Sequence, residues 1–148
     1  MKELTVRTSI EINAPAHRVW TVLTTSEFTR QYMHGCDVVS DWKLGSPLLW
    51  RGTYEGKEVV FVKGTIVKLE VDRALHYTTF GPMEPLEDIP VNYMTVTYEL
   101  APRAGGVTLA VSQGDFSKRA DGTGAKHYEG GEAGWLAILQ QIKALAEA

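Results

Sequence analysis

Cysteine is almost absent from the sequence, since Cys36 is the only one among 148 residues. A single thiol excludes an internal disulfide bond and fits a reducing compartment. Two other features are missing: a run of about 18 apolar residues, which a membrane-spanning helix needs, and a basic run that could neutralise successive phosphates. We therefore expect a cytoplasmic protein that has neither a membrane nor a nucleic acid as its partner.

Metal-ligand clusters and cofactor motifs are missing as well. His34 and Cys36 could supply two ligands, but no second cluster stands at a matching spacing, so we expect no metal site. The glycines of Gly52–Gly56 resemble a phosphate loop only superficially, because the spacing is wrong and Glu58 stands where a metal-binding hydroxyl is required. We expect no cofactor.

The composition that is present is that of an ordinary globular protein. Hydrophobic residues make up 44% and charged residues 22%, and the formal net charge is −3. A chain of this length buries about 68 to 70% of the surface that its unfolded form exposes, which suffices for one core. We expect a single domain over residues 1–148.

Hydrophobic periodicity predicts an α+β fold. Alternation over Leu4–Asn13 predicts a half-buried strand, Pro15 favours a short helix that ends near Thr24, and Ser26 can cap a second helix that ends near Tyr32. Turn residues tolerant of positive φ, such as Glu55-Gly56, separate the later strands, which should form an antiparallel meander. These later strands are Leu48–Tyr54, Glu58–Leu69, Leu75–Phe80, Asn92–Leu100 and Val107–Phe116.

The last segment predicts one long helix that covers the sheet. Apolar residues from Trp135 to Ala146 fall within about 120° of one another at 100° per residue. Extending this face backwards adds Tyr128, Gly131 and, at its edge, His127. Because glycine has no side chain, we expect the helix to stand off the sheet near Gly131 and to leave a pocket there.

Three groups of residues resemble motifs of a known family. They are Ile12–Ala16 followed by Val19-Trp20, the hairpin Gly106–Leu109, and Gly134-Trp135 with Leu139. In this order they resemble the START-like (SRPBCC) helix-grip superfamily, and within it the branch of the homologues of the activator of the heat-shock-protein-ninety ATPase. The resemblance implies a curved antiparallel sheet wrapped around the C-terminal helix, with two short helices after the first strand and a mostly apolar cavity in between.

A ligand-binding cavity is the function that the sequence favours, with an apolar or aromatic small molecule as the partner. Several polar side chains are expected to face inward from the sheet and the helix, where an unpaired polar atom is costly unless a ligand or water bonds it. The predicted lining residues are Trp50, Tyr54, Tyr77, Thr79, Met94, Val96, Tyr98, Val111, Gln113, Tyr128, Gly131 and Trp135.

Other functions stay open. The resemblance alone implies a co-chaperone that stimulates a heat-shock-protein ATPase, as a monomer or a homodimer. An enzyme of cyclase or hydrolase type would need Asp115 and His127 as an acid/base pair, although an aspartate at that position often only caps a turn. The sequence predicts no particular reaction. The acidic, proline-rich segment Gly81–Pro90 reads as a loop, either a passive connection or a lid over the cavity.

Overall fold

The fold is described from a computed structural model, for residues 4–118 and 128–148. Within these residues, seven antiparallel strands form one sheet in the order β1-β7-β6-β5-β4-β3-β2. The strands are β1 (Val6–Ile12), β2 (Asp37–Ser40), β3 (Pro47–Tyr54), β4 (Lys57–Glu70), β5 (Ala74–Thr79), β6 (Met94–Arg103) and β7 (Gly106–Gly114). The helices are α1 (Ala16–Thr24), α2 (Ser26–Tyr32) and α4 (Gly131–Glu147), with short 3₁₀ turns at η1 (Pro90–Asn92) and η2 (Phe116–Lys118).

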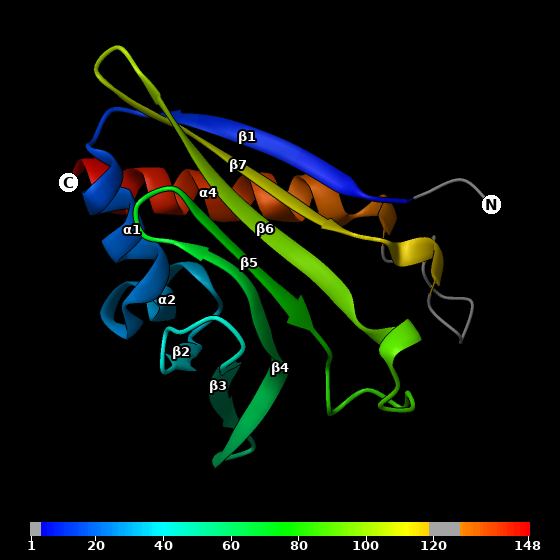
Figure 1. Cartoon of the computed structure of the whole chain (residues 1–148). Coiled ribbons are helices and arrows are strands. Elements are labelled where there is room, and N and C mark those ends of the chain that lie inside the picture. The colour runs from blue at the N-terminus through cyan, green and yellow to red at the C-terminus, as the bar shows by residue number, and fades with distance from the viewer. Residues whose placement is uncertain (1–3, 119–127) are drawn as a thin grey trace.

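The curved sheet wraps around α4, as the sequence predicts. Figure 1 shows α4 crossing behind β1, β7 and β6, while α1 and α2 lie beside the C-terminal end of α4. Contacts join α4 to β1, to α1 and to α2. This is the predicted α+β helix-grip arrangement, and the face of the sheet that looks at α4 carries the core.

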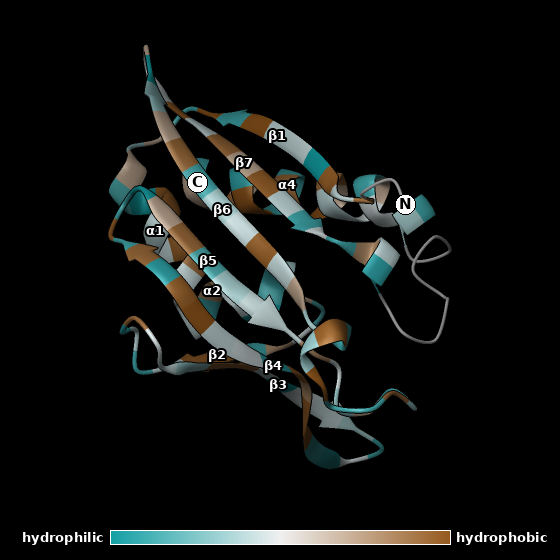
Figure 2. Ribbon diagram, turned by 45° about the vertical axis from the view of Figure 1, so that its right-hand side comes forward, coloured by the Kyte–Doolittle hydropathy of each residue, from teal (hydrophilic) through white to brown (hydrophobic). Residues whose placement is uncertain are grey.

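Side-chain alternation determines which face of the sheet is buried. In β6, Met94, Val96 and Tyr98 are buried and alternate with half-buried residues. Figure 2 shows the corresponding alternation of apolar and polar bands along β6 and β7. The register pairs Val96 with Gln113 and Tyr98 with Val111, so the inward-facing residues of the two strands are the ones that the sequence predicts.

Strand β4 belongs to both halves of the sheet. Its first part pairs with β3 and its last part with β5, with an irregular register near Phe61 and Val67. Gly64 lies near the end of the first part, where it pairs with Leu48, and an added Cβ there would stand 1.5 Å from the carbonyl oxygen of Thr78. Only glycine allows this close approach. Figure 1 shows that β4 bends, so that β3 and β2 turn away from β5 and β6.

The buried stripe of α4 is confirmed, but the expected gap at Gly131 is wrong. Trp135, Leu139 and Ile142 are buried against the sheet. At Gly131, an added Cβ would stand only 2.5 Å from the Cγ2 atom of Val6 in β1. The missing side chain therefore brings the first turn of α4 against the edge of the sheet and does not hold it away.

Two further details differ from the predictions at the N-terminal half. Ser26 is the first residue of α2, and the N-cap position is Thr25. The Ser26 hydroxyl caps no helix amide and donates instead to the carbonyl of Val38, 3.1 Å away. Strand β2 was not predicted. It has only four residues and is too short to show a period of two.

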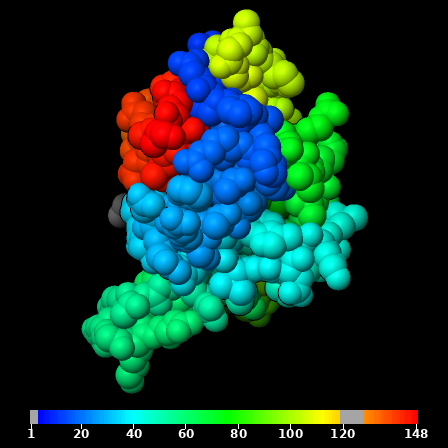
Figure 3. All heavy atoms as spheres, turned by 90° about the vertical axis from the view of Figure 1, so that its left-hand side faces the viewer, coloured from blue at the N-terminus to red at the C-terminus, as the bar shows by residue number. Residues whose placement is uncertain are grey.

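The hairpin between β3 and β4 extends away from the rest of the molecule. In Figure 3 it projects as a teal-green arm below the blue α1 and α2. Tyr54, at the tip of this hairpin, has 51% of its surface exposed. The turn is formed by Glu55 and Gly56, both with positive φ, as predicted.

Candidate functional site

A cavity of about 750 Å³ lies between the sheet and α4. Buried residues of β3, β5 and β6 form most of its sheet side. The opposite side is formed by residues of α4 between Gly131 and Gln141. The residues of β3 to β7 that line it are Trp50, Phe61, Val62, Tyr77, Thr79, Met94, Val96 and Gln113. The volume lies within the range of about 300 to 1,000 Å³ that is usual for small-molecule pockets.

Small residues on α4 leave this space open. Gly134, Ala137 and Ile138 line the cavity on the helix side. An added Cβ at Gly134 would meet no atom within 4 Å, which is the reverse of the situation one turn earlier at Gly131. The glycine that opens the cavity is therefore Gly134, whereas Gly131 lies at the end of the cavity where helix and sheet meet.

A hydrogen bond joins α4 to the sheet at the cavity wall. The indole Nε1 of Trp135 donates a hydrogen bond to Oε1 of Gln113 at 2.8 Å. Trp135 is buried and meets Tyr98 edge to face, with a distance of 6.0 Å between the ring centroids. Packing thus fixes the indole, and the indole fixes the orientation of the Gln113 carboxamide.

A pair of buried tyrosines lies on the sheet side of the cavity, and one of them, Tyr77, lines it. The hydroxyls of Tyr77 and Tyr98 are 3.4 Å apart. Burial raises the pKa of Tyr77 to about 12, although hydrogen bonds with Tyr98 and Trp50 oppose this shift. Burial also raises the pKa of Tyr98 well above its ordinary value. Both hydroxyls stay protonated near neutral pH and can donate hydrogen bonds.

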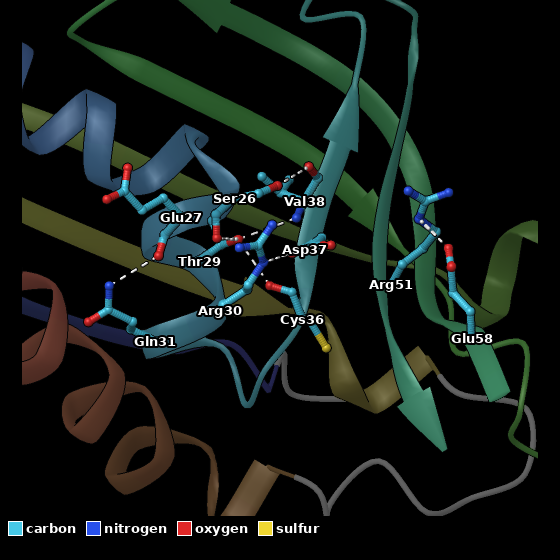
Figure 4. A network of polar contacts seen from close by, with 10 residues as sticks. All are labelled: Ser26, Glu27, Thr29, Arg30, Gln31, Cys36, Asp37, Val38, Arg51 and Glu58. Atoms are coloured by element: carbon cyan, nitrogen blue, oxygen red, sulfur yellow. Dashed lines mark hydrogen bonds and ion pairs between the residues drawn. The ribbon is translucent and has the colours of Figure 1, made fainter. Parts of the chain in front are cut away.

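The segment after α2 forms one rim of the cavity, and a set of hydrogen bonds between α2 and β2 holds it in place (Figure 4). The hydroxyl of Thr29 donates to the carbonyl of Cys36 at 3.0 Å and accepts from the amide of Val38 at 3.3 Å. Arg30 pairs with Asp37 at 2.5 Å. These contacts position the residues at the rim, which are Met33, His34 and Cys36.

Cys36 is a buried thiol in this rim. Burial, and then the negative charge of Asp37, raise the pKa of its side chain. The protonated form is therefore favoured, and the residue behaves as a small apolar group with little nucleophilic character.

The loop after β5 forms the opposite rim. Gly81, Met83 and Glu84 line the cavity. Further along the loop, Asp88 accepts hydrogen bonds from Lys63 and from Tyr93, and these hold this part of the loop against the sheet. The predicted loop is confirmed, while its action as a lid is still a prediction.

The structure brings together eight of the twelve predicted lining residues. Those that line the cavity are Trp50, Tyr77, Thr79, Met94, Val96, Gln113, Gly131 and Trp135.

Four predicted residues lie elsewhere. Tyr54 is at the exposed hairpin tip. Tyr98 and Val111 face inward but are covered by the core, so each is about 1 to 2% exposed. Tyr128 packs its ring against Phe116, with 6.2 Å between centroids.

Several residues of the cavity were not predicted. Gly134 could have been found, because it follows Gly131 by three residues and so lies on a neighbouring part of the same helix face. Phe61 could not, because it is the extra residue of an irregular strand pairing and the simple alternation rule fails there.

Asp115 caps a turn in the structure. One of its carboxylate oxygens accepts hydrogen bonds from the amides of Leu4 and Ser117, each at 2.9 Å, and from the Ser117 hydroxyl at 2.6 Å. These bonds lower the pKa of Asp115. A carboxylate that is stabilised in this way is a weak base. His127 lies outside the described residues, so the predicted acid/base pair stays untested.

Within residues 4–118 and 128–148, no three side chains of the metal-binding types gather in one place. Over the same residues, no helix is both long and apolar enough to cross a lipid bilayer.

The curved sheet, the long C-terminal helix and the cavity between them define a helix-grip domain. The model of the family of activator of Hsp90 ATPase homolog 1-like proteins matches residues 13–147. The chain belongs to this family.

Solved structures of similar proteins share the fold. A solution structure of a protein from Cytophaga hutchinsonii is 34% identical, with a TM-score of 0.80 over 99% of this chain and 97% of that one. A crystal structure of a protein from Mesorhizobium loti is 21% identical, with a TM-score of 0.72 over 95% of each chain. The Aha1 dimer from Colwellia psychrerythraea shares the fold at 14% identity, with a TM-score of 0.71 over 97% of this chain and 96% of that one. No curated protein matches the sequence.

Proposed function

We propose that this protein binds an apolar or aromatic small molecule in the cavity between the sheet and α4. The observation that carries the proposal is the cavity of about 750 Å³, whose walls are largely apolar. Burying apolar surface of a guest contributes roughly 25 cal/mol per Å². A guest that fills part of this space therefore gains favourable free energy without any catalytic group.

The shape of the α4 wall supports the same proposal. Gly134 and Ala137 present little side-chain volume to the cavity, although a helix gains stability when alanine replaces glycine. A glycine inside a helix costs about 0.5 to 1 kcal/mol relative to alanine. The open space is thus kept at the expense of stability, which is the pattern of a site and not of an optimised core.

Filling the cavity from Gly134 tests the proposal. A leucine there would extend into the space, because an added Cβ meets no protein atom within 4 Å. We expect Gly134→Leu to stay folded and to lose binding of aromatic probes, such as 2-acetylnaphthalene, measured by thermal shift and by tryptophan fluorescence. The matched control is Ala144→Leu, at an exposed position of α4 outside the cavity. If wild type shifts with none of a panel of lipids and aromatics, or if Gly134→Leu binds as wild type does, the proposal is refuted.

A second candidate function, stimulation of a heat-shock-protein ATPase as a co-chaperone, is supported by family membership alone. Titration of the protein into the host's heat-shock ATPase tests it, with ATP turnover and co-elution as readouts. The relative from Colwellia psychrerythraea is a dimer. Sedimentation of the purified chain tests whether this protein also dimerises. An apolar cavity and a chaperone-binding surface can coexist, so these results are independent of the ligand assay.

A further inference from the structure

We propose that Gln113 selects ligands that present a neutral carbonyl oxygen to the cavity. The inference rests on the proposed function and names the chemical class of the guest. It depends on the orientation of one carboxamide and on the charges around it.

The orientation of Gln113 follows from its partner. The indole N–H of Trp135 can only donate, so the atom of Gln113 that lies 2.8 Å from it must be the oxygen. The Nε2 group therefore points away from Trp135. Among the described residues no group accepts a hydrogen bond from Nε2, and the atom is not enclosed by protein. Because Gln113 lines the cavity, its two N–H donors are available to a guest.

Two other side-chain donors in the cavity wall already have acceptors in the protein. Thr79 donates to the carbonyl of Met94 at 3.4 Å, and Asn92 donates to the carbonyl of Glu87 at 2.8 Å. The hydroxyls of Tyr77 and Tyr98 share one hydrogen bond, in which either can be the donor. His34 and Gln141 also line the cavity, but both are exposed. Gln113 is thus a half-buried donor of the sheet wall whose bond a guest can complete.

The charges at the cavity favour a neutral acceptor over an anion. Neither lysine nor arginine is among the described residues that line it, whereas Glu84 stands at the rim. Moving a carboxylate into an apolar space without a cationic partner is costly. A ketone, ester or amide oxygen can accept from Nε2 without this cost, so the carbonyl class is favoured.

Three naphthalene derivatives of similar shape test the inference: 2-acetylnaphthalene carries a neutral carbonyl, 2-isopropylnaphthalene carries no acceptor, and 2-naphthoate carries an anion. We expect wild type to bind the ketone more tightly than the naphthoate. In Gln113→Met, which keeps a similar volume and loses the donor, we expect the ratio of ketone to hydrocarbon affinity to fall about threefold to tenfold, which is the range for one hydrogen bond. Binding constants come from tryptophan fluorescence titration.

One further variant and one spectroscopic measurement help to interpret the result. Trp135→Phe removes the indole donor and frees the carboxamide to rotate, so it should lower the same ratio by less than Gln113→Met does. In wild type, the side-chain amide resonances of Gln113 in a nitrogen–proton spectrum should shift with the ketone and not with the hydrocarbon. This second readout applies even if a variant fails to fold.

The outcomes separate the two proposals. If wild type binds the ketone and the hydrocarbon, but Gln113→Met leaves their ratio unchanged and the Gln113 amide signals do not move, then the role of Gln113 is wrong and the cavity remains a binding site. Tightest binding of the naphthoate also overturns it. If wild type binds none of the three probes and none of the wider panel, both proposals fail.

Discussion

Two alanine substitutions in the same helix are expected to change stability in opposite directions. Gly131 and Gly134 are separated by a single turn of α4, and neither has a positive φ, so alanine is compatible with the backbone at both positions. They differ in what a methyl group would meet. At Gly131 it would stand 2.5 Å from the Cγ2 atom of Val6, whereas at Gly134 it would meet nothing within 4 Å.

The expected changes in the free energy of unfolding follow from these distances. Val6 is buried and branched at Cβ, so it has few alternative positions, and relief of the overlap requires a shift of helix or strand. Overpacking of this kind costs about 1 to 3 kcal/mol. The intrinsic gain of alanine over glycine, about 0.5 to 1 kcal/mol, offsets only part of this cost, and less at the first residue of a helix than inside it. Gly134→Ala receives the gain alone.

Thermal and urea unfolding measure both effects. For a chain of this size, 1 kcal/mol corresponds to a change of about 2 to 4 °C in Tm. We expect Gly131→Ala to lower Tm by about 2 to 6 °C and Gly134→Ala to raise it by about 1 to 4 °C. Combining Gly131→Ala with Val6→Ala should give a coupling free energy above about 0.5 kcal/mol, because the smaller residue relieves the overlap.

A Gly131→Ala protein as stable as wild type would refute the reasoning. It would mean that the first turn of α4 stands off β1, as sequence periodicity alone suggests. A Gly134→Ala protein of lower stability would show that the cavity wall is occupied at that point.

Two further predictions concern polar groups of the scaffold. Tyr32→Phe should lower the free energy of unfolding by about 1 to 2 kcal/mol, because the buried hydroxyl donates to the Leu23 carbonyl at 2.8 Å; Tyr54→Phe, at an exposed ring, should change it little in the same denaturant titration. The lowered pKa of Asp115 means that its contribution to stability is present above about pH 4 and is lost as the pH falls through the folded-state pKa. Asp115→Asn should therefore be less stable than wild type at neutral pH, and the difference should shrink on acidification; a difference that is independent of pH would contradict this account.

The strands and the terminal helix could be predicted because their patterns are local. Alternation in β6 and β7 places Val96 opposite Gln113, and the stripe from Trp135 to Ala146 faces the sheet, as expected. These patterns depend only on the period of each element, and the buried face of each element follows from that period.

The details of the site could not be predicted because they depend on contacts across the fold. Sequence shows that Gly131 and Gly134 lack side chains, but only the position of Val6 reveals which glycine packs and which opens space. The extra residue at Phe61 interrupts the alternation of β4 and brings an aromatic ring to the cavity. The inward-facing Tyr98 is covered by Trp135, a contact between segments 37 residues apart in sequence (135 − 98 = 37).

The bend of β4 has a consequence for how this cavity can vary (Figure 1). The strands on either side of the bend are joined through β4 alone: β3 and β2 follow its first part, β5 and β6 its last. The angle between the two halves therefore helps to determine how the lining residues of β3 lie relative to those of β5 and β6. We expect a substitution at Gly64, which does not line the cavity, to change the shape of the cavity without replacing any residue that a guest would touch.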